Sequence, residues 1–492
     1  MSLVDVDVWA VLAGVDDDML SHSPQSDVDG GALSRCGRAA RATIHEPFGF
    51  VKPARFGDDL PTPVEYLDVR DETSSGEGES LRILMVAPTS FFADYGCHVR
   101  ILEEIRALQA RGHVVRICTY HNGRDLDGVD TRRSVDVPWL KRAEVGSSRH
   151  KAYLDVALFF ETLRQAVRFR PDVIHGHLHE GALIGSVIGR MLRIPVVFDY
   201  QGSLTEEMLD HGFIRKRGLR ERFFRRLERR IDRMPAAVIA SGVAGVNYLS
   251  GSGLDPERIV LIQDGVDLNR FDPVTASKDR ATVRADLGIP PDAPVVVYLG
   301  LLAEYQGTSL LLDAAKILRA RRDNVYIVVA GYPGADHYAA EATAMGLNGH
   351  VLFPGRVAYE DAPALLAAGD VAVAPKRSTT ESNGKLLNYM ALGLPVVATD
   401  TQTNRAILGE LGHLVPPGDP TALADAIERA FDDPPAERIA LRQRIADAFA
   451  WQTRVLDLER VYASVRRQRE RPVRTVTDRV PAPTKPGTAS RK

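Results

Sequence analysis

A polar loop that leads into a short apolar helix stands between residues 375 and 400. Ser378 to Gly384 is polar, and apolar residues then repeat at helical spacing from Leu386 to Leu392. A loop in front of a helix presents backbone N–H groups and the positive end of the helix dipole, which attract an anionic phosphate. The pattern predicts an anion site here, although an ordinary loop, helix and strand of an α/β protein has the same pattern.

Two histidines are the other candidates for chemistry. His175 and His177 flank Gly176 directly after an apolar strand. A single histidine is more often structural, but a pair at the end of a buried strand favours a site. We predict no metal, because carboxylates with ligand spacing do not accompany these histidines in the sequence.

Strands and helices must alternate to position these residues. Short β-branched runs are separated by helical patterns in two series, which meet near residues 264–273. Strands separated by helices form parallel sheets with right-handed crossovers. We expect ligands at the carboxyl ends of the strands. The strands expected are 82–87, 114–119, 172–175, 195–199, 237–240, 259–262, 294–299, 325–330, 350–353, 371–374 and 395–399.

Five segments between residues 82 and 465 resemble landmarks of one enzyme family. They are GHVVRICTY (112–120), RPDVIHGH (170–177), IQDGVDLNRFDP (262–273), YLGLLAEYQGTSLLLDAA (298–315) and NGKLLNYMALGLPVVAT (383–399). In this order they are similar to retaining glycosyltransferases of the GT-B architecture, in the family 4 group. The resemblance implies an α/β protein with two doubly wound Rossmann-like domains that face each other across a cleft.

The domain boundaries follow from this resemblance and from local composition. We expect an acidic, mostly disordered extension over 1–80 and an acceptor-side domain over 81–268. A donor-nucleotide-binding domain over 269–448 follows. A helix over 449–468 would pack back on the first domain, and 469–492 would be a basic disordered tail.

The resemblance implies a nucleotide-sugar donor, UDP- or GDP-linked, as substrate and no other cofactor. It assigns His177 and Glu381 to catalysis. The donor-binding set is Gly96, Gln306, Arg356, Lys376, Lys385, Leu386 and Asn388. On the acceptor side, the loop after the first strand would direct Asp94 and His98 toward the acceptor, and Gln201 would line the same cleft.

Two departures from the family pattern bear on activity. Leu301 and Gln306 stand where the family has an arginine and a lysine that neutralise the departing phosphates. We expect the charge to come from the opposite loop, which carries Lys376, Arg377 and Lys385. Asn388 also stands where a glutamate binds the ribose, although an amide can bond the same hydroxyls. Glu381 would reach the sugar if the loop is shifted by one residue.

Composition restricts the partners. A net charge of −3 and 45% hydrophobic residues are ordinary for a globular protein, and three cysteines are too few for a disulfide framework. We expect a cytoplasmic protein, and no apolar run reaches the ~18–20 residues that span a bilayer. Residues 213–234 form a basic amphipathic helix. It would contact the anionic inner face of the membrane, or it would pack on its sheet with a solvated basic face. No nucleic acid module accompanies it.

The sequence therefore predicts a hexosyltransferase-like enzyme that moves a sugar to a glycan or lipid-linked acceptor with retention, in polysaccharide or glycolipid assembly. Two alternatives stay open. A nucleotide-sugar epimerase would need acid/base pairs facing the sugar, and none is evident. A non-catalytic sugar-nucleotide or glycan-binding scaffold would explain the missing cations at Leu301 and Gln306.

Overall fold

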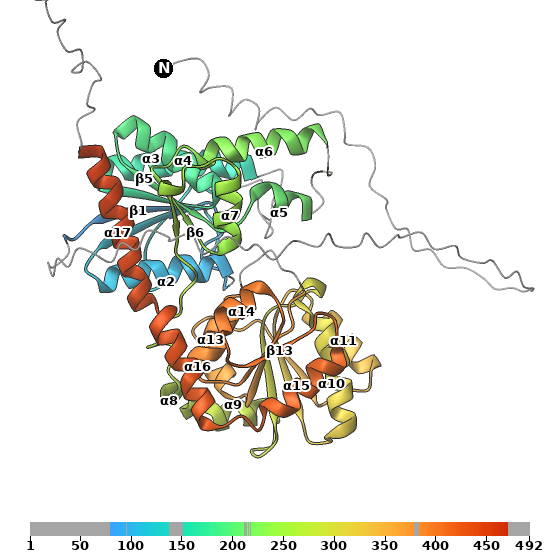
Figure 1. The fold of residues 1–492 in the computed structure, drawn as a ribbon. Coiled ribbons are helices and arrows are strands. Elements are labelled where there is room, and N and C mark those ends of the chain that lie inside the picture. The colour runs from blue at the N-terminus through green and yellow to red at the C-terminus, as the bar shows by residue number, and fades with distance from the viewer. Residues whose placement is uncertain are drawn as a thin grey trace, which may run out of the picture. The chain divides into compact units, whose positions relative to one another are not determined.

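A computed structural model describes residues 79–94, 96–136, 151–210, 214, 216, 218–377 and 383–470. Of the extensions expected over 1–80 and 469–492, residues 1–78 and 471–492 lie outside the described residues. The rest contains two parallel sheets with helices around them (Figure 1).

The first sheet has the strand order β3-β2-β1-β4-β5-β6-β7, and every pairing in it is parallel. Its strands are β1 (Arg82–Ala87), β2 (Val114–Thr119), β3 (Asp130–Arg133), β4 (Val173–His177), β5 (Val196–Tyr200), β6 (Ala237–Ala240) and β7 (Ile259–Leu261). Its helices are α2 (Gly96–Ala110), α3 (Lys151–Phe169), α4 (Leu178–Leu192), α5 (Leu204–Asp210), α6 (Leu219–Asp232) and α7 (Val243–Gly251), with the 3₁₀ turn η2 (Pro256–Arg258).

The second sheet has the order β10-β9-β8-β11-β12-β13 and is also parallel. Its strands are β8 (Val295–Leu301), β9 (Tyr326–Tyr332), β10 (Val351–Gly355), β11 (Val371–Ala374), β12 (Val396–Thr399) and β13 (His413–Val415). The helices are α8 (Pro273–Ala276), α9 (Arg280–Asp286), α10 (Thr308–Arg321), α11 (Ala335–Ala344), α12 (Ala362–Ala367), α13 (Lys385–Ala391), α14 (Gln402–Leu408), α15 (Pro420–Ala430), α16 (Pro435–Ala448) and α17 (Trp451–Glu470), with the turns η3 (Ser277–Asp279) and η4 (Glu304–Gln306).

Burial explains why these strands read as continuous apolar runs. Every residue of β1 from Ile83 to Ala87 is buried, as is all of β5, because helices cover both faces of a doubly wound sheet. The predicted fold class of two Rossmann-like α/β domains is confirmed. Strands β3 and β13 were not predicted, because β3 is polar (DTRR) and β13 has only three residues.

Helix α17 brings the end of the described chain back to the first sheet. It contacts α2 and β5, and Glu459 on it pairs with Arg111 at 2.9 Å and with His113 at 3.0 Å. The Tyr462 hydroxyl lies 2.8 Å from His175 Nδ1. Helix α17 therefore packs against the first sheet beside His175.

Candidate active site

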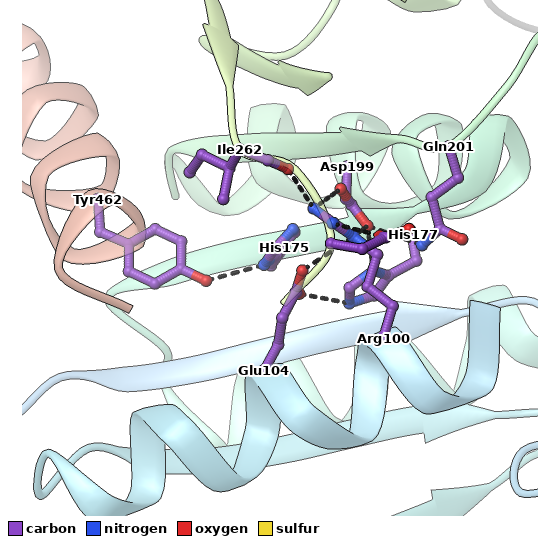
Figure 2. A network of polar contacts seen from close by, with 9 residues as sticks. Arg100, Glu104, His175, His177, Asp199, Gln201, Ile262 and Tyr462 are labelled. Atoms are coloured by element: carbon purple, nitrogen blue, oxygen red, sulfur yellow. Dashed lines mark hydrogen bonds and ion pairs between the residues drawn. The ribbon is translucent and has the colours of Figure 1, made fainter. Parts of the chain in front are cut away.

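Strand register places His177 beside Asp199. The two residues are direct partners in the β4–β5 ladder, so their side chains leave the sheet on the same face. His177 Nδ1 lies 3.1 Å from Asp199 Oδ2, and the Gln201 amide donates to the same oxygen at 2.7 Å (Figure 2). The sequence-predicted residues His177 and Gln201 thus meet through a carboxylate that the sequence analysis did not single out.

A close approach of the backbone fixes the end of β4. A Cβ on Gly176 would lie 2.6 Å from the Gly181 carbonyl oxygen, so only glycine lets the first turn of α4 fold back over the strand. The side chains of His175 and His177 are consequently buried, and their rings stack at 4.5 Å between centroids.

Arg100 of α2 is the cation of this cluster. It bonds Asp199 twice, from Nε to Oδ2 at 3.0 Å and from a terminal nitrogen to Oδ1 at 2.8 Å. Burial alone would raise the pKa of Asp199, but the Arg100 charge, aided by His177, lowers it far below its ordinary value. The Asp199 carboxylate is therefore ionised at any physiological pH.

The proton on His177 follows from that charge. An ionised carboxylate can only accept hydrogen bonds, so Nδ1 of His177 carries the proton that points to Asp199. In the neutral ring, Nε2 is then an acceptor. Among the described residues this buried nitrogen has no hydrogen-bond partner, and a Glu104 carboxylate oxygen lies 4.0 Å away.

Glu104 and the two histidines form a set that resembles a metal site in composition. Ligand atoms of Glu104, His175, His177 and Asp199 lie within 4.8 Å of one another. The expectation that no metal is needed rested on carboxylate spacing in the sequence, whereas the fold brings two carboxylates to the histidines. However, the Arg100 guanidinium bonds both Asp199 oxygens and lies 3.1 Å from Glu104. A fixed cation in this place repels a second one, so we interpret the cluster as an ion-pair network.

The charge state of the network supports this interpretation. Burial, followed by the nearby Asp199 charge, raises the pKa of Glu104 well above its ordinary value and favours the neutral acid. Burial likewise lowers the pKa of His175 and favours its neutral form. The guanidinium of Arg100 therefore faces one ionised buried carboxylate, Asp199, and the partly exposed Asp264.

The loop after β1 joins the two sheets through Asp94. This side chain accepts from Arg124 and Arg356, each at 2.7 Å, and from the backbone N–H of Tyr359 at 3.0 Å. The structure thus brings Asp94, expected on the acceptor side, together with Arg356, expected at the donor. Both residues are engaged with each other here.

His98 and Gly96 occupy the start of α2. His98 is buried between Phe91 and Phe92, and its Nδ1 accepts from the Ala93 N–H at 2.9 Å. Burial lowers the pKa of His98 to about 3, so the ring is neutral. This arrangement gives His98 a role in holding the loop, while its contact with an acceptor stays a prediction. Gly96 is the first residue of the helix.

The second sheet carries the predicted donor residues Lys385 and Gln306. The Lys385 amine donates to Gln306 Oε1 at 2.9 Å and to the Tyr298 hydroxyl at 3.1 Å. It lies over the Tyr298 ring, and a Cβ on Gly300 would come within 2.8 Å of it. Lys385, the first residue of α13, therefore lies at the carboxyl end of β8, next to Gln306.

Three further predicted donor residues lie in or shortly before α13. Lys376 is buried, Leu386 is a fully buried apolar residue of α13, and Asn388 is half-buried one turn later. Arg377 instead pairs with Glu304 at 2.9 Å in an exposed position. Glu381 lies outside the described residues, so its proximity to the site stays a prediction.

Sequence reasoning missed Arg100, Glu104 and Asp199 as members of the site. Arg100 and Glu104 lie one turn apart on the buried side of α2. Charged residues on the apolar side of a helix and in a buried strand were the available signal, because burial of a charge requires a partner.

Helix α6 differs from its expected packing. Its buried residues are Glu228, Ile231 and Asp232, while Phe223 and Leu219 are 43% and 83% exposed. The acidic side chains are buried because His179 of α4 lies 3.5 and 3.4 Å from them. The apolar stripe expected over Phe223 to Ile231 is therefore only partly the packed face. None of the described helices is long and apolar enough to cross a membrane.

Comparisons with known proteins agree with this geometry. Residues 95–265 match the model of a glycosyl transferase 4-like domain, and residues 293–433 match that of glycosyl transferases group 1. The chain is 27% identical over 394 residues to a phosphatidyl-myo-inositol mannosyltransferase of Mycobacterium leprae, covering 78% of this chain and 97% of the relative. It is 34% identical over 225 residues to a D-inositol 3-phosphate glycosyltransferase of Salinispora tropica, covering 42% of this chain and 46% of the relative.

Solved structures share the two-sheet fold. Anabaena HepE in complex with UDP and glucose has a TM-score of 0.63 at 19% identity, covering 78% of this chain and all of that one. WaaG, a glycosyltransferase involved in lipopolysaccharide biosynthesis, has a TM-score of 0.59 at 16% identity and covers 77% of this chain and 99% of its own. The two domain matches identify the chain as a glycosyltransferase, and the solved structures show that it has the GT-B fold.

Proposed function

We propose that the chain transfers a sugar from a UDP- or GDP-sugar to a glycan or lipid-linked acceptor, with retention of the anomeric configuration. The observation that carries the proposal is the Lys385 amine held at the carboxyl end of β8, beside Gln306. Ligands of doubly wound sheets bind at this edge. The complexes of HepE with UDP and glucose and the mannosyltransferase name of the mycobacterial relative support the choice of donor and acceptor class.

Each half of the chain would supply one part of the chemistry. Lys385 would neutralise the charge that develops on the departing diphosphate, which is the main demand of this reaction. In the first domain, Nε2 of His177 is buried in this structure, and it would bond a hydroxyl of the transferred sugar once the residues that cover it move aside. Asn388 would bond the ribose, and Glu381 the sugar hydroxyls. The acceptor would lie on the side of Gln201.

A panel of UDP- and GDP-sugars tests the proposal. We expect one donor to bind by isothermal titration calorimetry and to be hydrolysed slowly without acceptor, with the initial product anomer, read by proton NMR, matching the donor. An inverted anomer would contradict retention. Binding without turnover, unaffected by Glu381→Ala, would favour the scaffold alternative, which Leu301 and Gln306 suggest.

We further propose that the exposed side of α6 contacts anionic lipid. Leu219 and Phe223 are exposed one turn apart, and the surrounding exposed side chains are arginines. An apolar pair within a basic surface suits an anionic bilayer. The arginines are Arg220, Arg222, Arg226, Arg229, Arg230 and Arg233.

Vesicle sedimentation tests this contact. The chain should bind phosphatidylglycerol-containing vesicles more than pure phosphatidylcholine vesicles, and Phe223→Ser with Arg226→Ser should reduce that binding. The control Ile439→Ser changes another exposed apolar residue, 70% exposed, on α16. Equal binding by all three proteins would refute the contact.

A further inference from the structure

Arg100 connects three elements of the fold through one side chain. Besides its two bonds to Asp199 of β5, it donates to the Ile262 carbonyl at 3.2 Å (Figure 2). It also donates to Asp264 at 2.8 Å. Residues 262 and 264 follow β7, in the segment that leads to the second sheet. The Arg100 side chain is 4% exposed, so water does not compete for these bonds.

The geometry of the guanidinium determines the orientation of Asp199. Because the planar guanidinium bonds both carboxylate oxygens, it fixes the plane of the Asp199 carboxylate. A point charge such as a lysine amine would not. In that plane Oδ2 also receives the His177 Nδ1–H and the Gln201 amide. Rotation of Asp199 would break both, so the direction of the His177 ring depends on Arg100.

Asp264 extends this dependence to the second sheet. A Cβ on Gly384 would lie 3.8 Å from an Asp264 carboxylate oxygen, and Gly384 directly precedes Lys385. The Arg100 guanidinium therefore contacts both Asp199, which orients His177, and Asp264, which lies next to the start of α13.

We propose that Arg100 is a positioning residue: through Asp199 it holds His177 in the tautomer with Nε2 as acceptor, and through Asp264 it aligns that ring with the start of α13 at Lys385. The proposal rests on the proposed sugar transfer, in which His177 bonds the donor sugar once its buried Nε2 is uncovered. A competing explanation is that Arg100 only compensates buried negative charge. If Arg100 only compensates charge, Arg100→Lys should keep both stability and activity; if it positions His177, Arg100→Lys should keep stability but lose activity.

Substitutions at Arg100 separate charge from geometry. Arg100→Lys keeps the cation but loses the fork, and Arg100→Met loses both. We expect Arg100→Lys to retain most of the thermal stability and lose about 100-fold in kcat, the scale of a small misplacement of reacting groups. Arg111→Met is the control, because it removes a more exposed arginine near the same helix, paired with Glu459.

A double substitution tests the charge explanation directly. Arg100→Met removes the cation that bonds Asp264, so Arg100→Met with Asp264→Asn should regain part of the lost melting temperature. If Arg100 positions His177, kcat stays low in the double variant. Recovery of kcat together with stability, or full kcat in Arg100→Lys, would overturn the proposal.

A readout independent of activity keeps this test separate from that of the proposed function. Histidine side-chain ¹⁵N spectra, with His177→Gln to assign the signal, should show a single Nδ1–H tautomer of His177 in the wild type. Arg100→Lys should give a mixture of tautomers. An unchanged tautomer would refute the positioning role even if the enzyme is active. A wild type that neither binds nor hydrolyses any donor would instead refute the proposed function.

Discussion

The lysine at the end of β8 gives the most direct prediction about donor binding. Lys385→Gln keeps a polar side chain of similar reach but removes the charge. A cation about 4 Å from a phosphate oxygen contributes about 4 kcal/mol at an effective dielectric constant of about 20. Only the part of this energy that acts in the transition state affects the rate. Its loss should lower kcat/KM by about 10²–10³-fold, the usual cost of removing one such donor.

The position of Gln306 provides a rescue experiment. Its Oε1 lies 2.9 Å from the Lys385 amine, so exchanging the two side chains leaves an amine near the same place. Gln306→Lys with Lys385→Gln should regain at least about tenfold of the lost kcat/KM, or about 1.4 kcal/mol. The matched control is Lys316→Gln, an exposed lysine of α10 that should leave kcat/KM unchanged.

Steady-state kinetics with the best donor of the panel measure these values. A Lys385→Gln enzyme within threefold of the wild type would refute the assignment of Lys385 to the diphosphate. Loss without rescue by the exchange would show that the loop, rather than the charge alone, is required. Donor binding by calorimetry then separates ground-state binding from transition-state stabilisation.

Two further predictions concern stability. Gly176→Ala should destabilise the fold by about 1–3 kcal/mol in urea unfolding, because its Cβ would lie 2.6 Å from the Gly181 carbonyl. Gly251→Ala, where the same atom meets nothing within 4 Å, should not, and equal losses would contradict this reasoning. Burial, followed by the Asp267 charge, raises the pKa of Glu103 to about 7. The folded state then binds the proton more tightly, so stability should fall as pH rises from about 4.5 to about 7. Glu103→Gln should remove that fall in thermal melts, and a pH dependence like the wild type's would exclude Glu103 as its source.

Local patterns in the sequence predicted most of the elements, because a buried parallel strand is a short apolar run between helical patterns. Eleven expected strands correspond to β1, β2, β4 to β12 of the structure. The two strands missed lack that signal: β3 is polar, and β13 consists of His413, Leu414 and Val415. The resemblance to the glycosyltransferase family also directed attention to His177, Gln306 and Lys385.

The contacts among these residues depend on tertiary structure. His177 and Asp199 are 22 residues apart, and Arg100 and Asp264 are 164 apart. The β4–β5 register brings the first pair together, and the packing of α2 brings the second. Lys385, the first residue of α13, contacts Gln306 because α13 begins opposite the end of β8. Residue types and spacing therefore predicted the fold class and part of the site, but not Arg100, Glu104 or Asp199. The pairing of charges, and with it the proton positions, was decided by how the chain packs, because a buried charge persists only where folding supplies its partner.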